Sequence, residues 1–228
     1  MCKTYALFDF DGTLIRGDSI LLLCRYAFQK GLMSRRQLAA ALWTAVLYGL
    51  KLCPAVRAKE RALRFLAGLP AARVEAIARD FCDTVLRPRL RPEGLATIAR
   101  HKAEGRVTLL VSASSTFYLT FMVPALGVDD LIATRFDPDA DGVFRGQVCG
   151  DNCRGVQKAL RLAEYLAAKG DRLDVENSYA YGDSYGDLPM LRLCAHPVAV
   201  NPKRRLWRAL RGLPGVERVH WSEPEPNA

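Results

Sequence analysis

Two carboxylates at the end of a short apolar run constrain this chain more than any other feature. Residues 4–8 (Thr-Tyr-Ala-Leu-Phe) predict a buried strand that ends near Gly12. Because side chains alternate along a strand, Asp9 and Asp11 point to the same side of it. Burying two like charges together is costly unless a cation compensates them. The stretch therefore predicts a divalent-metal site, although Asp-Gly is also a common turn dipeptide.

The composition is that of a globular protein with free thiols. The chain has 228 residues, of which 50% are hydrophobic, enough for one large domain or for a core domain with a smaller insertion. Its seven cysteines are odd in number and include no Cys-x-x-Cys pair, which argues against a disulfide framework or a zinc site. None of the three histidines lies within four residues of another, so a histidine metal site is not expected.

Neither a signal peptide nor a membrane span is expected. The first strand begins almost at the first residue, and no cleavage-type sequence precedes it. The longest uncharged apolar stretch, residues 37–50, is 14 residues long, short of the roughly 20 that cross a bilayer. We therefore expect a cytoplasmic protein without stable membrane insertion.

The net charge of +9 raises the question of a nucleic-acid partner. Lysines and arginines are spread over the whole length, and no recognised nucleic-acid motif accompanies them. We expect no nucleic-acid partner. The charge is interpreted as a solvated basic surface or as a field that attracts small anionic substrates.

The order of elements predicts an α/β fold with a helical insertion. Residues 17–87 show helical patterns and no strand signal, whereas strands and helices alternate from residue 92 onward. We predict a Rossmann-like, doubly wound, mostly parallel sheet formed by residues 1–16 and 88–228, with residues 17–87 inserted as an all-helical cap domain. Residues 222–228 are expected to form a frayed tail. The four insertion helices are expected to begin near Asp18 or Ser19, Ser34, Pro54 and Pro70, and later strands are expected within 107–111, 129–136, 177–181 and 197–200.

An acidic turn lies between two of the later elements. Residues 137–142 (Asp-Pro-Asp-Ala-Asp-Gly) resemble the opening of a calcium loop, but the twelfth position is Val148 instead of glutamate. We therefore expect a hairpin turn between residues 132–136 and 143–148.

Three further strand ends carry polar residues of matching chemistry. Ser112 follows the strand at 107–111, where hydroxyls and free N–H groups can hold an anion. Lys158 falls near the start of a helix expected from about residue 154 to 169, where a cation does not complement the helix dipole. A bound phosphate would account for this lysine, although most lysines are simply exposed. Asp183 and Asp187 form a second acidic pair after the strand at 177–181.

With these residues the chain resembles the haloacid dehalogenase-like superfamily of phosphohydrolases. The four motifs of that superfamily match Asp9–Thr13 (Asp-x-Asp-x-Thr), Ser112, Lys158 and Gly182–Asp187 (Gly-Asp-x-x-x-Asp), in the right order. The helical insertion between the first two motifs is similar to the cap of the phosphoserine phosphatase-like branch.

The resemblance implies a phosphatase that depends on Mg²⁺ and acts on a small phosphorylated metabolite. It implies that Asp9 attacks the phosphorus and forms an aspartyl-phosphate, and that Asp11 handles the protons. Ser112 and Lys158 would bind the phosphoryl oxygens. It also implies a metal site built from Asp9, the backbone carbonyl of Asp11, Asp183 and Asp187.

The resemblance does not fix the substrate. Phosphoserine phosphatases typically carry Ser-Gly-Gly in the second motif and asparagine before the last aspartate, where this chain has Ser112-Ala113-Ser114 and Gly186. Asp18 and Arg57 are candidates for substrate recognition, with a helix cap and an exposed cation as the simpler interpretations. A lipid-linked phosphate as substrate, a phosphotransferase activity and a non-catalytic phosphate-binding protein remain alternatives.

Overall fold

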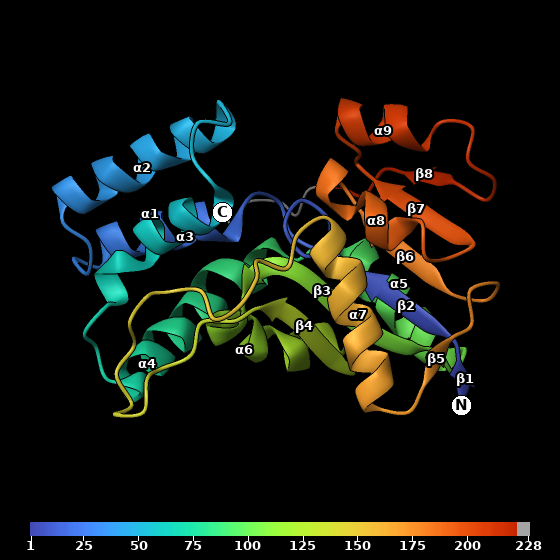
Figure 1. Ribbon diagram of the computed structural model, residues 1–228, viewed down its shortest axis with the longest axis horizontal. Coiled ribbons are helices and arrows are strands. Elements are labelled where there is room, and N and C mark those ends of the chain that lie inside the picture. The colour runs from blue at the N-terminus through green and yellow to red at the C-terminus, as the bar shows by residue number, and fades with distance from the viewer. Residues whose placement is uncertain (223–228) are drawn as a thin grey trace.

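The structure is a computed structural model that describes residues 1–222. A six-stranded parallel sheet forms the centre of the molecule (Figure 1). Most of the expected frayed tail, residues 223–228, lies outside the described part. All five pairings are parallel, which confirms the predicted fold class. In spatial order the strands are β4 (Asp130–Thr134), β3 (Val107–Ser115), β2 (Tyr5–Phe8), β6 (Tyr179–Gly182), β7 (His196–Val200) and β8 (Glu217–Val219).

β2 occupies the interior of the sheet, with β3 on one side and β6 on the other. Its side chains alternate between two separate cores, because Tyr5 and Leu7 pack on one face of the sheet and Ala6 and Phe8 on the other. All four are buried, as expected for a parallel strand covered on both faces. The chain therefore leaves the middle of the sheet directly at Asp9.

Helices cover both faces of the sheet, as a doubly wound fold requires. The core that contains Tyr5 and Leu7 also receives side chains from the last three helices, and the opposite core receives them from the two helices that flank β3. The first group is α7 (Val156–Ala168), α8 (Leu188–Leu191) and α9 (Arg204–Leu210), and the second is α5 (Pro92–Ala103) and α6 (Thr116–Leu126). Short helical turns cover Arg64–Leu66, Cys82–Leu86, Arg87–Arg89 and Tyr185–Asp187.

The segment between β2 and β3 begins with four helices and contains no strand, as predicted. The helices are α1 (Ser19–Gln29), α2 (Arg35–Gly49), α3 (Ala55–Leu63) and α4 (Ala71–Phe81). Asp18 caps α1 by accepting bonds from the N–H groups of Ile20 and Leu21, and Ser34 forms a capping box with Gln37 at the start of α2. α4 packs against α6, whereas α2 lies outermost in this segment (Figure 1).

The expected hairpin after β4 is reduced to two isolated antiparallel bridges, Arg135 with Cys149 and Pro138 with Phe144. The Asp139 carboxylate holds the intervening turn by accepting bonds from the N–H groups of Asp141 and Val143, at 3.0 and 2.9 Å. This carboxylate therefore serves the turn, which is the role expected for the acidic segment.

Two sheet features were not predicted. β8 extends the sheet beyond β7, and β1 (Cys2–Lys3) pairs in parallel with β5 (Arg172–Leu173). These strands have two or three residues and are mostly exposed, so they lack an apolar pattern. All seven cysteines are free, as expected. Among residues 1–222 no helix combines the length and apolar character that crossing a bilayer requires.

Candidate active site

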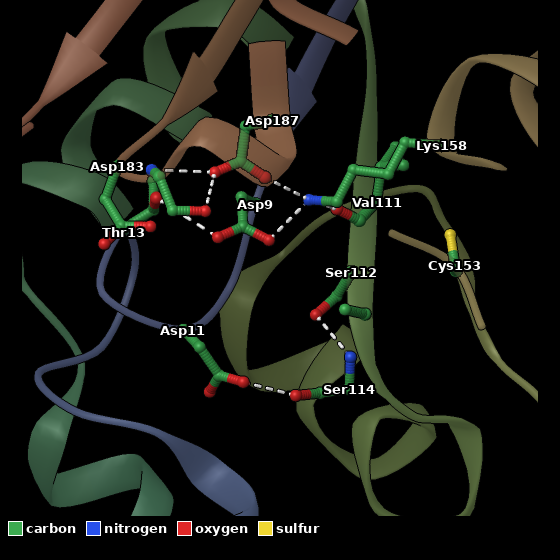
Figure 2. A network of polar contacts seen from close by, with 12 residues as sticks. Asp9, Asp11, Thr13, Val111, Ser112, Ser114, Cys153, Lys158, Asp183 and Asp187 are labelled. Atoms are coloured by element: carbon green, nitrogen blue, oxygen red, sulfur yellow. Dashed lines mark hydrogen bonds and ion pairs between the residues drawn. The ribbon is translucent and has the colours of Figure 1, made fainter. Parts of the chain in front are cut away.

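Lys158 is buried at the centre of the site and binds the first acidic motif (Figure 2). Its Nζ donates to Oδ1 of Asp9 at 2.6 Å, to Oδ1 of Asp187 at 2.7 Å and to the carbonyl oxygen of Val111 at 2.7 Å. The residue is only 1% exposed. Burial opposes its charge, but Asp187 and Asp9 outweigh that effect and raise the pKa of Lys158. The interpretation of Lys158 as a solvated surface lysine is therefore wrong.

Three carboxylates gather around this lysine. Oxygen atoms of Asp9, Asp183 and Asp187 all lie within 4.8 Å of one another, and all three residues are buried. Burial raises the pKa of Asp9 well above its usual range, and the neighbouring charge of Asp187 raises it further. Burial likewise raises the pKa of Asp183, although Lys203 lies 2.6 Å from it. Three carboxylates face two lysines, so this compact set of oxygen donors keeps an excess of negative charge, which fits a hard divalent cation such as Mg²⁺.

Glycine is required at two positions of this cluster. Gly12 has φ +80°, and a Cβ there would lie 2.4 Å from an oxygen of Asp183. A Cβ on Gly182 would lie 2.6 Å from the Cβ of Asp187. Atoms that close overlap, so the first motif approaches Asp183 only because Gly12 lacks a side chain. The last motif folds back on itself only because Gly182 does.

Asp11 points away from the cluster, toward Ser114 (Figure 2). Its carboxylate accepts bonds from the N–H of Ser19 at 2.9 Å, the hydroxyl of Ser19 at 3.1 Å and the hydroxyl of Ser114. Burial raises the pKa of Asp11 to about 6, and the charge of Asp18 contributes. A carboxyl group with this pKa can give up and take a proton near neutral pH, as acid–base catalysis needs.

Ser112 lies inside β3 and not after it, because β3 continues to Ser115. The pairing of β3 with β4 shifts register between Ser112 and Ser115. Within this irregular stretch the hydroxyl of Ser112 accepts a bond from the N–H of Ser114 at 3.0 Å. Such a shift redirects side chains at the end of a strand, and it places Ser112 and Ser114 between Lys158 and Asp11 (Figure 2).

A cavity of about 230 Å³ lies beside Asp11, between the insertion helices and the end of β3. We call it the chamber. Its polar lining includes Asp11, Asp18, Lys59, Ser114 and Arg154. Much of the remaining wall is apolar and includes five alanines of α2 and α3: Ala41, Ala45, Ala55, Ala58 and Ala62.

Lys59 enters the chamber from α3, a position that was not predicted from the sequence. Its Nζ donates to the carbonyl oxygen of Ala113 and to the side chains of Asn152 and Thr134, the last at 3.4 Å. Burial lowers the pKa of Lys59 to about 8. The acceptors belong to β3, β4 and the loop after β4, so Lys59 ties α3 to the site.

The two candidates for substrate recognition have different surroundings. Asp18 lines the chamber and also caps α1. Arg57 is exposed and lines a separate surface hollow together with Glu60 and Arg61. The structure thus brings Asp9, Asp11, Ser112, Lys158, Asp183 and Asp187 into one site with Asp18 at the adjoining chamber, and it places Arg57 outside that chamber.

The geometry agrees with comparisons to known proteins. The model of the haloacid dehalogenase-like hydrolase family matches residues 6–192. The chain belongs to this family. A histidinol-phosphatase of Neisseria meningitidis serogroup C is 32% identical over 209 residues, which cover 90% of this chain and 93% of that protein. These findings confirm the predicted family and the phosphatase class.

Solved structures give the same result for the fold of this haloacid dehalogenase-like hydrolase. A Bordetella pertussis protein of unknown function has a TM-score of 0.86 at 27% identity, covering 96% of this chain and 99% of its own. A phosphoserine phosphatase, solved as an analogue of its phospho-aspartyl intermediate, has a TM-score of 0.66 at 21% identity, covering 96% and 94%. The second likeness concerns the fold alone.

Proposed function

We propose that this haloacid dehalogenase-like hydrolase is a Mg²⁺-dependent phosphatase that cleaves a small phosphomonoester through an aspartyl-phosphate on Asp9. The observation that carries the proposal is the buried position of Asp9, which Lys158 holds at 2.6 Å beside Asp183 and Asp187. A carboxylate fixed in this way has one oxygen directed by a cation and another near the acidic cluster. It is therefore positioned as a nucleophile and not as a turn residue.

The reaction divides between the two acids of the first motif. An oxygen of Asp9 attacks phosphorus, and the bond from phosphorus to the alkoxy oxygen breaks while protonated Asp11 gives its proton to that oxygen. Asp11 then takes a proton from water, which attacks the phosphorus of the acyl phosphate and releases inorganic phosphate and Asp9. The hydroxyls of Ser19 and Ser114 keep the Asp11 carboxyl aimed away from the cluster during both steps.

The remaining residues neutralise and hold the phosphoryl group. The residues that would hold Mg²⁺ are Asp9, Asp183 and the backbone carbonyl of Asp11, with Asp187 beside them. The bound cation would screen the nucleophile from the negative charge of the substrate. Lys158 supplies a fixed positive charge, and Ser112 lies next to it at the irregular end of β3. To donate to a phosphoryl oxygen, Lys158 would exchange one of its three present acceptors for that oxygen.

We also propose that residues 17–87 act as the cap and that the chamber holds the rest of the substrate. The alanine-rich wall suits a compact, largely apolar group, and Asp18 can pair with an ammonium. A carboxylate is less suited, because Lys59 already donates to oxygens of β3 and the loop after β4 and the guanidinium of Arg154 lies over the ring of Tyr48. The expected substrate class is therefore a phosphorylated amino alcohol without a carboxylate, which is consistent with the Neisseria relative named histidinol-phosphatase.

The test measures phosphate release with Mg²⁺ from p-nitrophenyl phosphate, histidinol phosphate and phosphoserine. We expect turnover that Asp9→Asn abolishes while the thermal unfolding curve stays cooperative. Asp137→Asn, at an exposed salt-bridged acid outside the site, is the matched control. Near wild-type turnover by Asp9→Asn would refute the mechanism, whereas a preference for phosphoserine above histidinol phosphate would refute only the substrate class.

A further inference from the structure

The outer face of α2 is apolar, and no element within residues 1–222 covers it. Trp43, Val46 and Leu50 are 64%, 52% and 63% exposed. Their spacing of three and four residues places them on one stripe of the helix. Leu42 and Leu52 extend the stripe at 49% and 72% exposure. We call these five residues the outer apolar patch.

The opposite face of α2 is apolar as well, because Ala41, Ala45 and Tyr48 line the chamber. A helix that is apolar on all sides is normally buried within a protein or a membrane. α2 instead lies at the periphery of the molecule (Figure 1). The chamber accounts for its inner face, and the large side chains of its outer face have no partner in the described chain.

The charge around the patch is of one sign. Residues 19–59 contain no aspartate or glutamate and seven lysines or arginines. Lys30 pairs with Asp80 and Lys59 enters the chamber, which leaves Arg25, Arg35, Arg36, Lys51 and Arg57. Arg35 and Arg36 are exposed in the first turn of α2, and Lys51 is exposed just beyond its end. The helical period of 100° per residue puts both arginines on the same side as Val46 and Trp43. The patch is therefore flanked by cations at both ends.

A neighbouring part of the same segment adds further positive charge. Two surface hollows between α2, α3 and the loop after β4 are lined by Arg36, Arg57, Arg61, Arg64 and Arg145, with Glu60 as the acid among them. Guanidinium groups in this arrangement suit phosphate oxygens. The apolar patch and the cationic hollows thus lie on adjoining surfaces of the insertion.

We propose that the outer apolar patch docks on an anionic lipid bilayer, with α2 lying parallel to the membrane plane. Leucine, valine and tryptophan side chains enter the interfacial region, where tryptophan is favoured, and the flanking cations pair with lipid headgroups. A second copy of this chain fits the patch less well, because it would bring two segments of the same positive charge together. Docking of this kind needs no membrane-spanning helix.

Docking through the outer apolar patch would also set the position of the chamber relative to the membrane. Leu42 belongs both to the outer apolar patch and to the chamber wall. The chamber is therefore adjacent to the docked surface, and the strand ends that carry Asp9 lie behind it.

The test measures co-sedimentation of the full chain with vesicles of phosphatidylglycerol and, separately, of phosphatidylcholine. We expect binding to phosphatidylglycerol vesicles that weakens in high salt. The Arg35→Gln/Arg36→Gln variant should bind about 30-fold more weakly, given the usual contribution of a basic residue near an anionic surface. The Trp43→Ser/Leu50→Ser variant should bind about 10-fold more weakly because it loses apolar contact.

Matched controls separate docking from general damage. Leu160→Ser/Val175→Ser removes two side chains of similar exposure from the sheet domain, and Arg172→Gln removes an exposed arginine there. Both controls should bind vesicles like the wild type, and all variants should hydrolyse p-nitrophenyl phosphate equally. The proposal is overturned if the wild type stays in the supernatant or if the patch variants bind as it does. It is also overturned if sedimentation without vesicles shows a dimer that Trp43→Ser/Leu50→Ser dissociates.

Discussion

The Nζ of Lys158 lies 2.6 Å from Asp9 and 2.7 Å from Asp187, in a position that is almost fully buried. One cation thus holds an acid of the first motif and an acid of the last motif together. Removing it would leave two buried carboxylates without their common partner, a change that typically destabilises a protein by about 3–5 kcal/mol. The lysine is therefore expected to matter for folding as well as for phosphate binding.

We predict that Lys158→Met lowers the unfolding free energy by about 3 kcal/mol or more and abolishes phosphate release. Lys169→Met is the matched control, because Lys169 follows the same helix and its side chain is 50% exposed. Denaturant unfolding and p-nitrophenyl phosphate hydrolysis measure the two effects. Part of the lost stability should return with added Mg²⁺, since a bound dication also compensates the carboxylates. A Lys158→Met enzyme as stable as the wild type without metal would contradict this account.

Gly12→Ala tests the close approach of the first and last motifs. The new Cβ would overlap a carboxylate oxygen of Asp183 at 2.4 Å, so we expect phosphatase activity to fall by at least about 100-fold, the size of effect expected when a catalytic group is misplaced by about 1 Å. Gly105→Ala is the control because Gly105 has a similar φ of +77° and no atom within 4 Å of a new Cβ. Both variants should lose about 1–2 kcal/mol from the left-handed backbone. Equal activities of the two variants would show that the contact with Asp183 is unimportant.

The buried His101 side chain should make the unfolding free energy depend on pH. It is 1% exposed, and its Nε2 lies 2.7 Å from the Tyr181 hydroxyl. Burial, aided by Arg106, lowers the pKa of His101 to about 4, below the roughly 6.5 of an unfolded chain. Between these values the unfolded state binds more protons, so the unfolding free energy should fall as pH drops from about 6.5 to 4, by up to about 3 kcal/mol.

The His101→Gln variant isolates this effect from the titration of other groups. Denaturant unfolding of both proteins at pH 7, 6, 5 and 4.5 gives the difference in free energy at each pH. We expect the unfolding free energy of the wild type to fall relative to that of His101→Gln as the pH drops below about 6.5. A difference that stays constant from pH 7 to 4.5 would show that His101 titrates normally.

Lys59 and Arg57 form a second matched pair, because they lie on the same helix and only Lys59 reaches the chamber. Lys59 holds α3 to Ala113 and Asn152 by charge-assisted hydrogen bonds, so we expect Lys59→Met to loosen the chamber wall and to raise KM by about tenfold. Arg57→Met should change KM by less than about twofold. Because burial lowers the pKa of Lys59 to about 8, the wild-type KM should rise above that pH and the Lys59→Met value should not. Steady-state kinetics from pH 6.5 to 9.5 would measure KM for the wild type and for both variants. Identical KM profiles for the two variants would show that the charge of Lys59 does not hold the chamber in a form that favours substrate binding.

The sequence allowed the central elements and the candidate site residues to be predicted because their patterns are strong. Residues 4–8 and 107–111 are continuous apolar runs, and each leads directly to polar residues at the site. The position of Lys158 near the start of a helix indicated a nearby anion only weakly, because most lysines are exposed. The order and spacing of the four superfamily motifs assigned it to the site.

The parts that were missed depend on packing. The extension of β3 through Ser112–Ser115 is polar, so it lacks a strand pattern, and its geometry comes from the irregular pairing with β4. Lys59 and Arg57 are two residues apart, and only the way α3 packs against the sheet domain decides which of them enters the chamber. Such a choice between helix faces is not encoded in residue type.

The interior position of β2 has a consequence for how the molecule is assembled. This strand pairs with β3 and β6, which begin about 100 and 170 residues further along the chain. Such non-local pairings form slowly, because the chain loses the entropy of closing a long loop before the contacts between the strands stabilise it. The nucleophile therefore belongs to an early part of the chain but acquires its surroundings only when Lys158 and Asp187 arrive. Activity is expected to appear in a single late step of folding, with no active partially folded form before it.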